Sequence, residues 1–270
     1  MNWTELTNLE LELIDPIFFA MMEGELPALQ SLRLGPILSC SRPRENFTNF
    51  VTQLQPLSRL SLHGHTAQVN LTQMLDRHGG TLRSLQIREW ESKNTPKPVL
   101  SPQNLKEVNQ KCPMLSNLGL DLNRNGTWPF DMLDSLAAYK SLSSLEIFFE
   151  SEVAYQRDID AYDDELSRRN QDIQYREPIL NTTSSLQLFK RLRSLKEGAD
   201  LLQLRLSVGD VGREHSYEMY SDWSDRLTKT YECSVYDSDG RRKEEGVAWC
   251  ELVAESQSTY HDYHDLELTE

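Results

Sequence analysis

The segment LSNLGLDLNRNG, Leu115 to Gly126, holds the pattern that decides the fold. It opens with the phrase leucine-x-x-leucine-x-leucine, in which the last position is leucine or isoleucine. Leucines at alternate positions are expected on a strand that buries one face. The same phrase recurs along most of the chain, and its copies begin at Leu6, Leu29, Leu57, Leu82, Leu115, Leu142 and Leu201.

The copies are spaced like the units of a repeat protein. Their second leucines are Leu9, Leu32, Leu60, Leu85, Leu118, Leu145 and Leu204, which gives intervals of 23, 28, 25, 33, 27 and 59 residues. Most intervals lie near the 20 to 29 residues of a leucine-rich repeat. The last interval covers about two periods and contains an acidic stretch. We interpret that stretch, residues 150–178, as an insertion.

Between the phrases the hydrophobic period changes from two to about 3.6, which indicates a helix after a strand. Pro102 and Pro129 suit the first turns of helices. Gly79 and Gly80 predict a helix stop in which glycine adopts the left-handed conformation. Apolar residues at helical spacing predict helices at Ile14–Met21, Phe47–Leu54, Leu71–His78, Leu105–Cys112, Leu133–Ala137 and Leu188–Leu195.

Neither the strand nor the helix of such a unit can bury its apolar face alone, whereas stacked units bury a continuous core. We therefore predict an α/β fold: an irregular leucine-rich-repeat solenoid, a right-handed βα arc of about seven repeats over residues 1–209. The alternative is an ordinary α/β domain with leucine-rich strands. Residues 210–254 are predicted to add a β-hairpin cap, with strands at Tyr231–Tyr236 and Gly246–Val253 joined by DSDG. The acidic residues 255–270 are expected to form a mobile tail.

The repeats resemble the ribonuclease-inhibitor-like repeats of F-box proteins, particularly the divergent fungal F-box and leucine-rich-repeat proteins. The resemblance covers roughly Leu6 to Val208, and HGGTLRSLQI, NGTWPFDMLDSL and LLQLRLSVGD also contribute to it. Asn123 occupies the asparagine position of the repeat consensus. The asparagine ladder of regular repeats is absent, because the other units place Ile14, Ile37, His65, Trp90, Glu150 and Gly209 there.

In that family an F-box precedes the repeats, whereas here the first phrase begins at Leu6 and leaves no room for one. Adaptor binding is therefore not carried over to any residue of this sequence. What the resemblance implies is protein recognition by repeats like those that recruit substrates to ubiquitin ligases. A Skp-type adaptor is expected only if an F-box lies upstream. The alternative is a free-standing scaffold or regulator without a ubiquitin role.

The charge and the cysteines limit the partners and the compartment. The formal net charge of −14 would repel a phosphate backbone, so we expect no nucleic-acid partner. Much of the excess lies in residues 150–177, with nine acids and four bases, and in residues 251–270, with six acids and no base. Cys40, Cys112, Cys233 and Cys250 are widely separated, so we expect reduced thiols. Neither a secretory signal nor a membrane span is apparent, so we expect an intracellular protein, cytoplasmic or nuclear, without a membrane partner.

The polar positions of the strands are the candidate binding residues, because alternate strand residues project away from the leucines. Arg33, Arg59, His63 and Arg88 are expected to form a basic centre, with Glu10, Glu12, Asp121 and Glu146 on its flanks. Arginine forks pair with carboxylates or phosphates, so this centre suits an acidic or phosphorylated segment of a protein. The alternative is that they are ordinary solvated strand residues. The predicted partner-binding residues are Arg33, Arg59, His63, Arg88, Asp121, Glu146, Phe148 and Arg205.

The sequence offers little sign of metal, cofactor or enzymatic chemistry. His63 and His65 in HGH should face opposite sides of a strand, and HDYHD, from His261, lies in the predicted tail. No nucleophile elbow, Walker loop or dinucleotide fingerprint is present. We expect no metal, no cofactor and no catalysis. An enzyme on an unrecognised α/β fold is the remote alternative.

Overall fold

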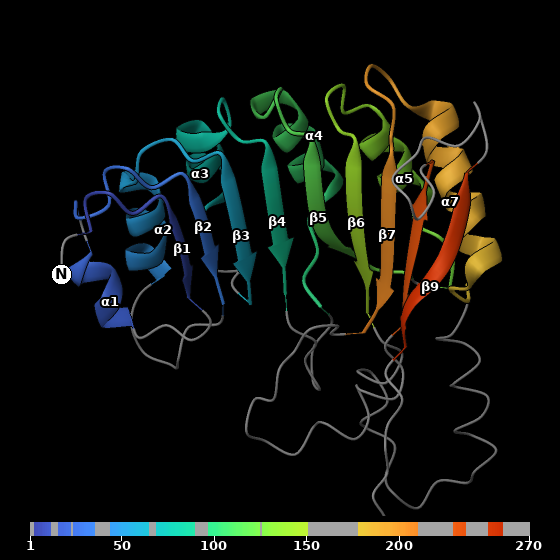
Figure 1. Ribbon diagram of the computed structural model, residues 1–270, viewed down its shortest axis with the longest axis horizontal. Helices are drawn as coiled ribbons and strands as arrows, with labels where there is room; N and C mark the ends of the chain where they lie inside the picture. Colours follow the sequence, from blue (N-terminus) through green and yellow to red (C-terminus); the bar gives the residue numbers. More distant parts are fainter. Residues whose placement is uncertain are drawn as a thin grey trace, which may run out of the picture.

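The computed structural model describes residues 3–11, 16–22, 24–35, 44–64, 69–89, 97–124, 126–150, 178–209, 229–235 and 248–255. Nine strands form one open sheet in chain order, β1 to β9 (Figure 1). From β1 to β7 neighbouring strands are parallel, and β7, β8 and β9 are joined antiparallel. The strands are β1 (Asn8–Leu11), β2 (Ser31–Leu34), β3 (Arg59–His63), β4 (Ser84–Arg88), β5 (Asn117–Leu122), β6 (Ser144–Phe149), β7 (Gln203–Val208), β8 (Lys229–Ser234) and β9 (Trp249–Glu255). The prediction of an α/β chain is confirmed at this level.

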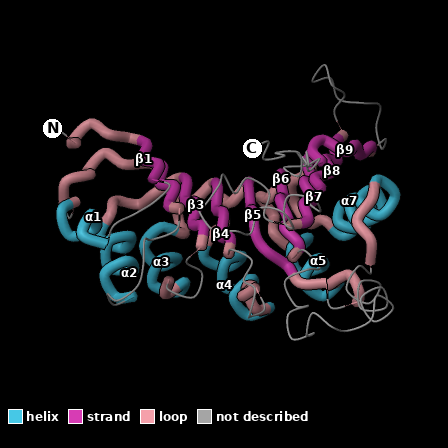
Figure 2. Tube along the Cα trace, turned by 90° about the horizontal axis from the view of Figure 1, so that it is seen from below, coloured by secondary structure: helices cyan, strands magenta, loops and turns pink. Residues whose placement is uncertain are grey.

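Helices α1 to α5 lie on one side of the sheet (Figure 2). In that view the two ends of the sheet, at β1 and β9, bend away from the side on which α1 to α5 lie, so the other side of the sheet is concave. The helices are α1 (Pro16–Met21), α2 (Arg44–Gln53), α3 (Leu71–His78), α4 (Pro102–Lys111), α5 (Phe130–Ala137) and α7 (Thr182–Leu195).

Local sequence explains where several helices begin. The side chain of Asn70 accepts a hydrogen bond from the backbone N–H of Gln73 at the start of α3. Ser101 and Asn181 start α4 and α7 with reciprocal capping boxes, and Pro102 occupies the first turn of α4 as predicted. Such caps satisfy N–H groups that a helix cannot pair internally. Pro129 precedes α5 and serves as its N-cap residue.

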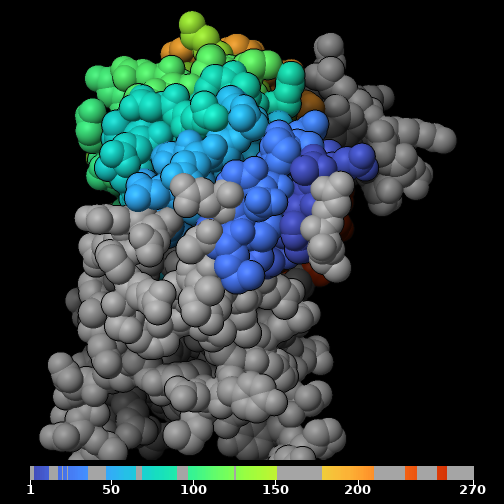
Figure 3. Space-filling view, turned by 90° about the vertical axis from the view of Figure 1, so that its left-hand side faces the viewer, coloured from blue at the N-terminus to red at the C-terminus, as the bar shows by residue number. Residues whose placement is uncertain are grey.

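The leucines of the phrases lie side by side across the parallel strands. Leu32 is in register with Leu60, Leu60 with Leu85, and Leu85 with Leu118, and the row continues to Leu9 on one side and Leu204 on the other. Each leucine from β2 to β7 in this row is at most 2% exposed. Burying one such side chain contributes about 1.5–3 kcal/mol. Seen from the β1 end, later segments lie behind the N-terminal ones (Figure 3).

The entry to each strand is fixed by a repeated backbone contact. Two consecutive N–H groups donate to one carbonyl of the preceding unit, as Arg83 and Ser84 do to Ser58 at 2.8 and 3.2 Å. The same pairing recurs before β2, β3, β5, β6 and β7. These contacts are local to neighbouring units, so they fix the spacing of the strands whatever the length of the chain between them.

Gly79 is required for a different reason from the one predicted. Its φ of −53° is right-handed, so it does not adopt the left-handed conformation that we expected. A Cβ at this position would lie 2.5 Å from the carbonyl oxygen of Lys111 and 2.6 Å from that of Leu75. The glycine therefore permits the close approach of α3 and α4.

The C-terminal hairpin corrects the prediction of reduced thiols. Cys233 on β8 and Cys250 on β9 stand opposite each other and form a disulfide. The wide separation in sequence concealed this pairing, because only the antiparallel register brings the two residues together. Cys112, by contrast, is a free cysteine buried in the core, as predicted.

Other predictions fall outside the described residues. These are the thiol of Cys40, the DSDG turn, residues 151–177 of the acidic insertion, residues 256–270 of the tail, and the consensus positions Ile14, Ile37, His65 and Trp90. Within the part of the chain that the structure describes, helices long and apolar enough to cross a membrane are absent.

Candidate functional site

The side of the sheet opposite the helices, which we call the open face, carries the candidate site. Alternate strand residues point to it, and the parallel register arranges them in rows across the strands. The entry row, at the beginnings of the strands, is Asn8, Ser31, Arg59, Ser84, Asn117, Ser144 and Gln203. The middle row is Glu10, Arg33, Ser61, Gln86, Gly119, Glu146 and Arg205.

A groove of about 500 Å³ runs between these two rows, from β1 to β6. Along the groove the entry row is serine or asparagine at every strand except β3, which carries Arg59, whereas the middle row also carries longer polar side chains, and leucines of β1 to β5 contribute to the floor. Such a lining leaves room above the strands and presents hydroxyl and amide groups to whatever occupies it. The groove can therefore accept a polar, elongated ligand.

The middle row is tied together by side-chain hydrogen bonds that cross several strands. Ser61 Oγ donates to Gln86 Oε1 at 2.8 Å, and His63 Nε2 lies 3.0 Å from the same oxygen. Gln86 Nε2 in turn donates to Glu146 Oε2 at 3.1 Å. Glu146 Oε1 then faces Arg205 Nε at 3.5 Å. The network fixes the orientation of groove side chains on β3, β4 and β6 and continues beyond the groove to β7.

Gly119 makes the hydrogen bond between Gln86 and Glu146 possible. It stands in register between Gln86 and Glu146, so the glutamine side chain passes over it to reach the glutamate two strands away. A Cβ at Gly119 would lie 2.8 Å from Gln86 Cγ. Any larger residue would therefore displace the glutamine.

Beyond the middle row, near the ends of the strands, the open face is closed by a buried charged cluster. The guanidinium carbon of Arg88 lies 3.4 Å from the ring centroid of Phe148. Lys97 Nζ lies 2.8 Å from Asp121 Oδ1, and both side chains are at most 2% exposed. The backbone N–H of Glu89 also donates to the Asp121 carboxylate. This cluster is packed like a core.

Burial dominates the pKa values on this face. It lowers the pKa of His63 from 6.5 to about 4, helped by the charges of Arg88 and Arg33. His63 is therefore neutral at pH 7. Burial raises the pKa of Glu146 despite the opposing charge of Arg205, and it raises the pKa of Asp121 despite Lys97.

The structure divides the predicted partner-binding residues into three groups. Arg33, Arg59 and Arg205 are exposed on the open face, whereas His63 and Glu146 are half-buried in the hydrogen-bonded network. Arg88, Asp121 and Phe148 are at most 8% exposed.

The expected basic centre is therefore not one continuous patch. Arg33 forms an ion pair with Glu10 at 3.1 Å, His63 is neutral and Arg88 is buried. Glu12, expected on its flank, lies outside the described residues.

Sequence reasoning did not include Gly119 or Lys97 among the site residues. The role of Gly119 depends on the side chain of Gln86, which lies beside it in the sheet. The role of Lys97 depends on its contact with Asp121, which lies more than twenty residues later in the chain. The alternation of strand residues could have marked Gly119 as an open-face position, because it lies between Leu118 and Leu120.

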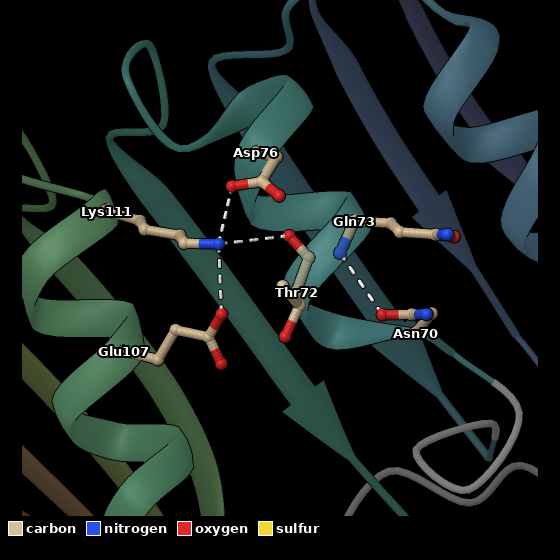
Figure 4. Close-up of polar contacts among 6 residues, drawn as sticks. All are labelled: Asn70, Thr72, Gln73, Asp76, Glu107 and Lys111. Atoms are coloured by element: carbon tan, nitrogen blue, oxygen red, sulfur yellow. Dashed lines mark hydrogen bonds and ion pairs between the residues drawn. The ribbon is translucent and has the colours of Figure 1, made fainter.

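A second polar cluster lies on the helix side and serves a different purpose. Lys111 of α4 contacts Asp76 of α3 at 2.5 Å and Glu107 at 3.0 Å, and it also approaches the carbonyl of Thr72 (Figure 4). The hydrogen bond from Lys111 lowers the pKa of Glu107. The cluster joins two neighbouring helices at the surface.

Two further observations bear on function. Among the described residues, no group of three or more histidine, cysteine, aspartate or glutamate side chains is placed to hold a metal ion. His65 and the HDYHD segment, which we considered for metal binding, lie outside those residues. No protein-family model matches the sequence, and no curated protein matches it.

Proposed function

We propose that the chain is a leucine-rich-repeat solenoid of the ribonuclease-inhibitor-like kind and that its open face binds another protein. Three observations support the repeat architecture. Each leucine phrase contributes one short strand, the leucines of neighbouring phrases are in register, and the entry to each strand has the same pair of backbone hydrogen bonds. Repeats of this kind stack so that each unit packs mainly against its neighbours.

The observation that carries the binding function is the contrast between the two sides of the sheet. The leucine side is packed under helices, whereas the open face holds an accessible groove lined by polar side chains from six successive strands. A concave sheet with ordered polar groups suits a protein ligand, because a solenoid offers an extended surface of this form. The polar network of Gln86 orients part of this surface before a partner arrives, which reduces the entropic cost of binding.

A role in a ubiquitin ligase is the narrower form of this proposal. It rests on the resemblance to the substrate-recruiting repeats of F-box proteins. Binding of a Skp-type adaptor is expected only if an F-box lies upstream. A scaffold or regulator with the same fold is the alternative. The intracellular location stays a prediction, and the Cys233–Cys250 disulfide is of a type more usual in oxidising compartments.

Site-specific photo-cross-linking tests the binding function. A photoreactive residue replaces Ser84, at the middle of the groove, in one variant and Gln110, exposed on α4, in the other. Neither residue belongs to the buried core. We expect discrete cross-linked protein products from position 84 in extracts of the source cells and none of the same mass from position 110.

The products cross-linked from position 84 are compared with those from position 110. Products common to both variants, or products from position 110 alone, would contradict binding through the open face. To test the ubiquitin-ligase form, affinity capture with this chain is compared with capture by a version extended upstream. Recovery of a Skp-type adaptor by the extended version alone supports that form.

A further inference from the structure

Two of the three exposed arginines around the groove form ion pairs with other described residues of the chain, and the third does not. Arg33 is paired with Glu10 at 3.1 Å, and Arg205 is paired with Glu146 at 3.5 Å. Arg59 is exposed in the entry row, and its guanidinium has no hydrogen-bond or ion-pair partner among the described residues. One positive charge in the groove therefore remains uncompensated by the described part of the chain.

The neighbours of Arg59 add neutral donors. Its partners in register are Ser31 on β2 and Ser84 on β4, and both serines line the same groove. A guanidinium offers five N–H donors in a planar fork, and each hydroxyl offers one more. Three consecutive strands thus present donors along one line, with the only full charge at its centre.

The length of the groove fits an extended peptide. It crosses six strands, β1 to β6. With neighbouring strands about 4.8 Å apart, five spacings give about 24 Å. An extended chain covers about 3.4 Å per residue, so roughly seven residues span that distance.

We propose that the groove binds an extended peptide segment of a partner protein and that Arg59 anchors one aspartate or glutamate side chain of that segment. The inference deepens the proposed function and rests on it. A carboxylate matches the planar guanidinium with two parallel hydrogen bonds and carries one negative charge. The backbone of the segment lies over the short side chains on either side of Arg59, where Ser31 and Ser84 donate to its carbonyl groups.

The charges nearby favour a carboxylate over a phosphate. A phosphate group carries close to two negative charges at pH 7, and its second charge has no unpaired cation to meet among the described groove residues. Glu10 lines the same groove and repels additional negative charge. The net charge of −14 also repels a phosphate more strongly than it repels a carboxylate.

An array of immobilised heptapeptides tests this assignment. The peptides have randomised flanks and a fixed central residue, which is glutamate, aspartate, glutamine, phosphoserine or lysine, and the probe is the fluorescently labelled full chain. We expect retention on the glutamate and aspartate sets to exceed retention on the glutamine set by about ten-fold, the effect of one charged hydrogen-bonded pair. Arg59→Gln should remove this preference, and Arg59→Glu should transfer it to the lysine set.

Arg83→Gln is the matched control, because Arg83 is also an exposed arginine but does not line the groove. It should retain the acidic preference. Thermal unfolding of each variant verifies that it folds, which is expected since both side chains are exposed. A preference that survives Arg59→Gln, or stronger retention on phosphoserine than on glutamate, would overturn the assignment and leave open-face binding intact. Failure of the wild-type chain to retain any set also overturns the peptide assignment, whereas the proposed function is decided separately by cross-linking from position 84.

Discussion

The two faces of the parallel strands are built from alternate residues of the same segments, yet they are organised differently. On the helix side, leucine meets leucine across the strands from β2 to β7, and each is buried in one continuous core. On the open face, adjacent positions hold arginine, serine, glutamine and glycine, and their contacts reach across several strands. The leucines repeat because the core requires it, and the open-face residues vary because the fold does not depend on them.

Part of the open face is buried like the core, and breaking the pair of Lys97 and Asp121 in that part should have the largest effect. Lys97→Met leaves the Asp121 carboxylate buried without its cation, which costs about 3–5 kcal/mol in the free energy of unfolding. Urea denaturation at pH 7 measures this loss. Lys106→Met, at an exposed position of α4, should change the free energy by less than about 0.5 kcal/mol. Equal effects of the two substitutions would show that the pair is not buried.

Adjacent residues of β5 give the most direct contrast between the faces. Leu118 is 2% exposed, and Leu118→Ala should cost about 2–5 kcal/mol because it removes transfer energy and leaves a cavity. Asn117 is exposed on the open face, so Asn117→Ala should cost less than about 0.5 kcal/mol. Chemical denaturation of the two variants measures both values. A larger loss from Asn117→Ala would reverse the assignment of the faces.

The disulfide should stabilise the antiparallel end of the sheet. Cys233 and Cys250 are 17 residues apart, and a cross-link over a loop of that size contributes about 3 kcal/mol. Replacing both by alanine should lower the free energy of unfolding by about 2–4 kcal/mol under non-reducing conditions. Adding a reductant should lower the stability of the wild-type protein similarly and leave the double variant unchanged. A wild-type stability that does not respond to the reductant would contradict the disulfide.

His63 should make the open face sensitive to mild acid. Its pKa is about 4 in the folded protein and 6.5 in the unfolded chain, so protonation favours unfolding. The stability that depends on neutral His63 is complete above about pH 6.5 and is lost as the pH falls toward 4. Relative to His63→Gln, the wild-type protein should lose about 1–2 kcal/mol between pH 7 and pH 5 after allowance for solvent screening. Parallel stability curves for the two proteins would show that His63 is not desolvated.

The parallel part of the fold was predictable because it depends on local repetition. Each phrase alone specifies a strand with one leucine face, and Leu32, Leu60, Leu85 and Leu118 pair as that pattern requires. The antiparallel end contains no such repetition. The pairing of Cys233 with Cys250 depends on the register of β8 and β9, which composition and spacing do not determine.

The candidate site was predictable only in part. Alternation within strands correctly placed Arg33, Arg59 and Arg205 on the open face, since side-chain direction follows from the strand period. It could not distinguish exposed from buried members of that face. Arg88 is buried by its stacking on Phe148, and Asp121 by Lys97, which are contacts between different units of the chain.

The leucine side of the sheet holds the fold together, and the groove residues of the open face do not. The stability of a variant with four groove substitutions tests this claim most directly. Ser31, Arg59, Ser84 and Asn117 line the groove from four successive strands, and all four are replaced by alanine. The free energy of unfolding, measured by urea denaturation, should then fall by less than it does for Leu118→Ala alone, with a single cooperative transition. A larger loss, or a broad transition, would show that the open face helps to hold the fold together and would contradict the claim.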